Sequence, residues 1–110
     1  MIRHLVHLRF RADVSRAEKE ELYADLAALS GHIDGILDFQ HRENVSVETP
    51  LVRDFLDMFW FDFRDARVRD TYLDDATHQA IGGRIVEKLE GGANGVFVCD
   101  VEVQTTYSLK

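Results

Sequence analysis

Between Phe55 and Phe63 the chain carries its strongest predicted strand, and both faces of that strand are apolar. Side chains alternate between the two faces of a strand. The alternation gives one face of phenylalanines and one of mixed apolar side chains: Phe59, Phe61 and Phe63, and opposite them Leu56, Met58 and Trp60. A strand of this kind needs cover on both sides. The rest of the chain must therefore cover one face, and a second layer must cover the other.

The remaining segments predict three more strands and two helical regions. Alternating hydrophobicity predicts strands over 2–10, 36–41 and 96–103. A capping box of Ser15 and Glu18 begins a helix that ends at Ser30-Gly31. Helical segments are also predicted over 64–73 and 77–90, with a loop over 42–53 and a glycine-rich connector over 91–95. The order β-α-β-β-α-β predicts an α+β, ferredoxin-like fold, a four-stranded antiparallel sheet with helices on one face.

The second face of this sheet predicts a partner. Two helices can cover only one face, and the other would expose an apolar patch larger than soluble monomers usually carry. The sequence therefore predicts a homodimer, a dimeric α+β barrel in which two sheets pack face to face. The predicted interface residues are Leu5, His7, Leu56, Met58, Trp60, Phe97, Cys99 and Val101.

Composition limits the classes of function that fit. The 110 residues, 45% of them apolar, are enough for one small core, so we expect a single domain over 1–103 and a polar tail over 104–110. Scattered basic residues and a net charge of −7 argue against nucleic acid and anionic membranes as partners. No apolar leader and no long apolar run stand in the sequence, so a cytoplasmic location is expected. The single cysteine, Cys99, predicts no internal disulfide.

Three side chains form the one constellation that predicts chemistry. His78 begins a helix with an apolar stripe, Tyr72 precedes it by six residues, and His4 shares a strand face with Val6 and Leu8. A neutral imidazole can act as a general base near neutral pH, and a phenol can donate a hydrogen bond to a carbonyl or enolate oxygen. Together they suit proton abstraction next to a carbonyl, followed by aldol-type closure, isomerisation or elimination, with no cofactor.

Other interpretations of the histidines and acids compete with this one. A histidine at a helix start is often only a residue of the cap region. His4 and His7 point to opposite faces of a strand and cannot chelate one metal ion, so no metal site is predicted there. Asp74-Asp75 is read first as a helix cap and only second as a divalent cation site. The chain has no phosphate loop, nucleophile elbow or dinucleotide fingerprint.

Several short motifs resemble those of the stress-responsive A/B barrel (Dabb) family. They are the opening 4–10 (HLVHLRF), the segment 44–48 (NVSVE), and Phe63 followed by Tyr72-Leu73 and Ala76-Thr77-His78. The resemblance, which covers nearly all of 1–103, implies a dimeric ferredoxin-like barrel. Family members include plant olivetolic acid cyclase, a polyketide cyclase, and the match implies Tyr72, His78 and His4 as catalytic residues. The chain departs from the family pattern at Asp75-Ala76 and Arg42.

The same resemblance implies a pocket between sheet and helices, with these walls: Val6, Leu8, Leu22, Tyr23, Leu26, Phe59, Phe61, Ile81, Gly82, Val96 and Val98. Gly82 lies one helical turn after His78 and leaves space beside it. The predicted function is binding of a small carbonyl-containing or aromatic molecule, with cofactor-free cyclase, isomerase or lyase catalysis left open. A non-catalytic, stress-associated structural homodimer is the alternative. A cofactor-independent monooxygenase using Trp60 ranks third, because it rests on fold analogy alone.

Overall fold

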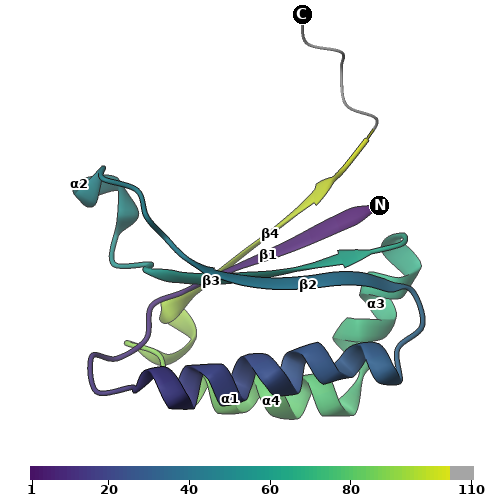
Figure 1. The fold of residues 1–110 in the computed structure, drawn as a ribbon, viewed down its shortest axis with the longest axis horizontal. Coiled ribbons are helices and arrows are strands. Elements are labelled where there is room, and N and C mark those ends of the chain that lie inside the picture. The colour runs from purple at the N-terminus through teal and green to yellow at the C-terminus, as the bar shows by residue number, and fades with distance from the viewer. Residues whose placement is uncertain (105–110) are drawn as a thin grey trace, which may run out of the picture.

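The computed structural model describes residues 1–104 as a four-stranded sheet with helices on one face (Figure 1). The strands are β1 (Ile2–Leu8), β2 (Ile36–Glu43), β3 (Asp57–Phe63) and β4 (Val96–Glu102). Their order is β2-β3-β1-β4, and every neighbouring pair is antiparallel. This is the predicted α+β, ferredoxin-like topology, which is confirmed. The predicted tail over 104–110 lies outside the described residues except for Gln104.

Helices α1 and α4 begin directly after their predicted capping residues. Helix α1 (Arg16–Ala27) starts at a capping box in which the Glu18 backbone N–H donates to the Ser15 hydroxyl at 3.1 Å. A short 3₁₀ turn, η1 (Ala28–Gly31), extends it. Helices α3 (Ala66–Asp74) and α4 (Ala76–Glu87) are separated by Asp75, which caps α4. The break at this position therefore turns the chain and sets the direction of α4.

The loop predicted over 42–53 differs from the structure at both of its ends. Strand β2 continues to Glu43, and one turn of helix, α2 (Thr49–Val52), carries Pro50 in its first turn. Proline suits that place because its missing N–H would have no helical partner there. Arg53 then takes a positive φ of 55° and ends the turn. In Figure 1, α2 lies on the side of the sheet away from α1 and α4.

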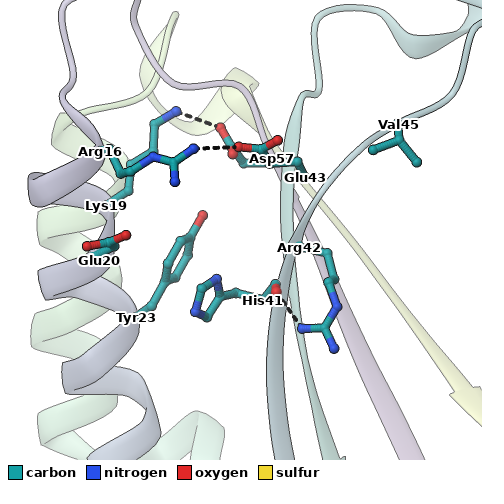
Figure 2. A pocket seen from close by; sticks show the side chains of 9 residues that line it. All are labelled: Arg16, Lys19, Glu20, Tyr23, His41, Arg42, Glu43, Val45 and Asp57. Atoms are coloured by element: carbon teal, nitrogen blue, oxygen red, sulfur yellow. Dashed lines mark hydrogen bonds and ion pairs between the residues drawn. The ribbon is translucent and has the colours of Figure 1, made fainter.

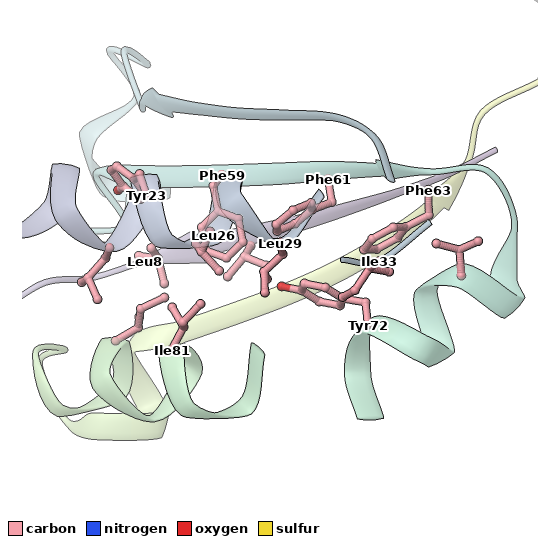
Figure 3. Close-up of a cluster of buried hydrophobic side chains, with 14 of the residues drawn as sticks. Leu8, Tyr23, Leu26, Leu29, Ile33, Phe59, Phe61, Phe63, Tyr72 and Ile81 are labelled. Atoms are coloured by element: carbon pink, nitrogen blue, oxygen red, sulfur yellow. The ribbon is translucent and has the colours of Figure 1, made fainter. Parts of the chain in front are cut away.

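The core fills the space between the sheet and the helices. Figure 3 shows Phe59, Phe61 and Phe63 in a row along β3, directed toward leucines of the helical layer. These three rings are 3%, 0% and 0% exposed, as the alternation predicts. Tyr72, from α3, packs against Phe61 and Phe63 with ring centroids 4.8 and 5.0 Å away. Of this aromatic row, Phe59 lines the cavity described below.

Among residues 1–104, the single helical turn α2 is the only helix on the opposite side of the sheet, and it leaves most of that face uncovered (Figure 1). On it Leu56, Phe97 and Val101 are 55%, 56% and 44% exposed. Trp60 lies between two arginines, with the Arg3 and Arg42 guanidinium carbons 5.8 and 5.5 Å from its ring centre. The predicted excess of apolar surface is therefore present on this face. Among residues 1–104, no helix has the length and apolar character needed to span a bilayer.

Candidate functional site

A cavity of about 290 Å³ lies between the inner face of the sheet and helix α4. Strands β1, β3 and β4 form its floor, and α1, α3 and α4 form its walls. The side chains that line it are His4, Val6, Leu8, Leu26, Phe59, Tyr72, Leu73, His78, Gly82, Ile85, Val86, Val96, Val98 and Asp100. At about 30 Å³ per water-sized group, it has room for roughly ten non-hydrogen atoms.

The three predicted catalytic side chains all lie at this cavity. The rings of Tyr72 and His78 are stacked with a tilt of 32°, and their centres are 3.8 Å apart. His4 meets the Tyr72 ring edge-on at 5.5 Å. Helix α4 fixes the position of His78 because its backbone N–H donates to the Asp75 carboxylate at 2.9 Å. The structure thus brings the three rings together, while their catalytic role remains a prediction.

The environment of these rings keeps the imidazole of His78 neutral and the phenol of Tyr72 protonated. Burial lowers the pKa of His78 below its ordinary 6.5, and the nearby His4 lowers it further, while Asp75 opposes both. Burial also raises the pKa of Tyr72 well above its ordinary value. Within residues 1–104, the buried Nδ1 of His78 has no hydrogen-bond partner. A neutral imidazole beside a protonated phenol is a suitable base and donor pair.

Asp100 is a member of this site that sequence reasoning missed. Its carboxylate accepts a hydrogen bond from Nδ1 of His4 at 2.6 Å and a second from Arg69 on α3 at 3.2 Å. His4 and Asp100 are paired across β1 and β4. The signal was the alternation of β4, which puts Asp100 on the same face as Val96 and Val98. Because an ionised carboxylate only accepts, Asp100 fixes the tautomer and orientation of the buried His4 ring.

The predicted cavity wall divides into two groups. Seven of the predicted residues line the cavity: Val6, Leu8, Leu26, Phe59, Gly82, Val96 and Val98. The other four do not. Leu22, Phe61 and Ile81 are buried in the surrounding core at 1%, 0% and 4% exposure. Tyr23 lies in a different pocket, because α1 turns this side chain toward the edge strand β2 instead of toward α4.

That other pocket is larger, about 630 Å³, and it is lined mostly by charged groups. Figure 2 shows the Tyr23 ring beside His41, with its hydroxyl directed toward two ion pairs. The pairs are Lys19 with Asp57 at 2.9 Å and Arg16 with Glu43 at 3.3 Å. The Tyr23 and His41 rings are stacked 4.4 Å apart. Asp57, the one acid on the inner face of its strand, is therefore paired with a lysine of α1.

No metal-binding cluster is found among the described residues. No three histidine, cysteine, aspartate or glutamate side chains in 1–104 are grouped so that they could hold an ion. Asp75 accepts from the His78 backbone and lies 3.0 Å from Nε2 of His32. Its carboxylate is therefore engaged in capping α4, which is the first of the two interpretations of Asp74-Asp75.

Comparison with known proteins identifies the family. A model of the stress responsive A/B barrel domain, Dabb, matches residues 2–103. The chain belongs to this family. The motifs at 4–10, 44–48 and 63–78 predicted that membership, and it is confirmed. A search of the curated proteins finds no match to this chain.

Solved structures of other proteins have the same fold. A dimeric ferredoxin-like protein of unknown function from Jannaschia sp. CCS1 is 30% identical, with a TM-score of 0.83 over 93% of this chain and 98% of that one. An Arabidopsis thaliana protein is 24% identical, with a TM-score of 0.83 over 99% and 100%. Hydroxynitrile lyase from Passiflora edulis is 12% identical, with a TM-score of 0.75 over 97% and 96%. The last two likenesses concern the fold alone.

Proposed function

We propose that this Dabb protein binds a small carbonyl-containing or aromatic molecule in the 290 Å³ cavity and that His78, Tyr72 and His4 act on it. The observation that carries the proposal is the meeting of these three rings at one end of an otherwise apolar cavity. Pockets that bind small molecules commonly combine apolar walls with a few convergent polar groups. The cavity has that composition, and its volume is close to the lower end of the usual range.

The chemistry that these residues favour is cofactor-free proton transfer. The neutral His78 imidazole would take a proton from the carbon next to the ligand carbonyl. The Tyr72 phenol would donate a hydrogen bond to the oxygen on which charge develops, and His4, held by Asp100, would support it. Aldol-type closure, isomerisation and elimination share this first step. One structural neighbour is a hydroxynitrile lyase, so the fold is compatible with a lyase.

We also propose that two copies pack through the uncovered face of the sheet. The Jannaschia neighbour is described as dimeric, and this face carries exposed apolar side chains on β4 and on Leu56, just before β3. The interface residues would be Leu5, His7, Leu56, Met58, Trp60, Phe97, Cys99 and Val101. Phe97→Asp would place a charge in this apolar face and should convert the dimer to a monomer in sedimentation velocity. Ala17→Asp, on the exposed side of α1, should leave the dimer intact.

A ligand screen tests the proposed binding site. Small ketones, esters and aromatic compounds would be screened by thermal shift against the wild type, His78→Ala and His41→Ala. His41 is a matched control because it lies in the charged pocket on the other side of the core. A compound whose stabilisation is lost only in His78→Ala supports the cavity as the site. Stabilisation that persists in His78→Ala and is lost in His41→Ala would move the site to the charged pocket.

A further inference from the structure

The polar groups of the 290 Å³ cavity lie together, and one of them is charged. His4, Tyr72, His78 and Asp100 are its only polar side chains among the described residues, and aliphatic side chains with Phe59 form the rest of the lining. A ligand that fills this space can therefore make polar contacts at one end only. Its other end must be apolar, because no donor or acceptor side chain is available there to replace water.

The only charged side chain on the described lining is an acid, and the arginine that contacts it is shared with a second carboxylate. In the described part of the chain, Asp100 is the only charged side chain on the cavity lining, and no lysine or arginine reaches it. Arg69 contacts Asp100 from outside at 3.2 Å, but it also binds Asp70 at 3.0 Å, so one guanidinium serves two carboxylates. The nearest imidazole, His4, already donates to Asp100. A ligand carboxylate or phosphate would find no free cation in this cavity.

Resting on the binding site proposed above, we infer that the ligand is a neutral carbonyl compound, a ketone, aldehyde or ester with a compact apolar body, and that Asp100 selects against anions. Like charges a few ångströms apart in a partly buried site repel strongly enough to change affinity by about tenfold or more. The net charge of −7 also repels anions. Carboxylic acids and phosphorylated or nucleotide-linked molecules should therefore bind more weakly than neutral carbonyl compounds of the same size.

Paired ligands that differ in charge and match in size test the substrate class. Acetophenone against benzoate, and methyl pentanoate against hexanoate, have equal numbers of non-hydrogen atoms within each pair. Dissociation constants would be measured by NMR titration, with the shifts of Val98, Gly82 and His78 reporting that the cavity is occupied. For the wild type we expect the neutral member of each pair to bind at least about tenfold more tightly than the anion.

Variants of Asp100 and Arg69 should change this preference in opposite directions. Asp100→Asn keeps the side-chain volume and an acceptor for His4, and it should reduce the neutral-to-anion ratio by about tenfold. Arg69→Gln removes the partial compensation of Asp100 and should increase the ratio. Asp57→Asn is the matched control, because it changes net charge equally in the other pocket and should leave the ratio unchanged.

The possible results separate the two proposals. Benzoate binding as tightly as acetophenone in the wild type, or a ratio that Asp100→Asn leaves unchanged, would overturn the substrate class while the binding site stands. If no member of either pair shifts the cavity residues, the proposed function fails, and the substrate class fails with it. A ratio that Asp57→Asn changes as much as Asp100→Asn would assign the preference to net charge and remove Asp100 from it.

Discussion

The charged pocket and the apolar cavity differ in how their charged groups are used. In the larger pocket, between α1 and β2, Lys19 binds Asp57 and Arg16 binds Glu43, so these charges satisfy one another. In the smaller cavity the walls are apolar and the polar groups converge at one end. The larger pocket therefore contains charged side chains that pair with one another. The smaller cavity has the composition of a ligand site. Pocket chemistry is a better guide to function here than pocket size.

The largest expected difference between the two pockets is in the rate of proton exchange after His78 or His41 is replaced. With a neutral ketone bound, His78→Ala should slow exchange of the proton next to the carbonyl with solvent deuterium by roughly 10²- to 10⁴-fold, the usual contribution of a general base. His41→Ala, in the charged pocket, should leave the exchange rate within about twofold of the wild type. NMR of the ligand in deuterated buffer measures both rates. Equal slowing in the two variants would erase the distinction between the pockets.

The adjacent glycines of α4 offer a sharper test of the cavity itself. A Cβ added at Gly82 or at Gly83 would meet no atom within 4 Å, so a side chain can begin at either position without a clash. Gly82 lines the cavity, whereas Gly83 is exposed. Gly82→Leu should fill the cavity and weaken ligand binding at least tenfold, about 1.4 kcal/mol, and Gly83→Leu should not. Both variants should unfold at a higher temperature than the wild type, because glycine destabilises a helix interior.

If Gly82→Leu and Gly83→Leu bound ligand equally well, the ligand would lie elsewhere. The melting temperature serves as the control for folding. A variant that melts above the wild type is folded, so a loss of binding cannot be attributed to unfolding. Calorimetric titration with a neutral ketone and a thermal melt on the same samples are sufficient.

The sequence predicted the elements of this fold because their signals are local. Alternation gave the strand faces, and the Ser15 and Glu18 capping box gave the start of α1. The one-turn helix α2 was missed because four residues around Pro50 are too short to show helical periodicity. The strand ends also shifted, since β2 runs to Glu43.

The candidate site was predicted only as far as single elements allow. His4, Tyr72 and His78 could be placed from their own strand or helix and from the family motifs. Asp100 could not, because its role depends on the register between β1 and β4, which neither strand specifies alone. The family resemblance placed Tyr23 on the cavity wall, whereas in the structure it lines the charged pocket. The position of β2 decides which side of the core this side chain reaches, and the resemblance did not supply it.

Tyr23 itself gives the next prediction. Its hydroxyl is buried and has no hydrogen-bond partner within residues 1–104. A buried donor left unpaired costs about 1–3 kcal/mol, so Tyr23→Phe should stabilise the protein by about 1 kcal/mol while keeping the ring stacked on His41. Chemical denaturation measures the change. A loss of stability instead would show that the hydroxyl donates to a bound water or ligand. The charged pocket would then become a candidate binding site.

The smallest expected effect is a dependence of stability on pH that comes from the apolar cavity. Burial lowers the pKa of His78 in the folded state below 6.5, so the folded protein binds fewer protons than the unfolded chain just below that pH. The contribution of His78 to stability is therefore complete above pH 6.5 and is lost as the pH falls through the lowered pKa. Burial lowers the pKa of His7 as well, so the wild type alone cannot assign the effect.

Variants separate the contribution of His78. His78→Gln should lose less stability than the wild type between pH 6.5 and about 5, whereas His41→Gln, which removes an exposed imidazole from the charged pocket, should follow the wild type. Thermal melts across this range measure the difference. A neutral ketone in the cavity should steepen the wild-type dependence, because it binds beside the imidazole and disfavours its protonation. An unchanged slope with ligand bound would mean that the ligand does not contact His78, and the base would have to be sought elsewhere.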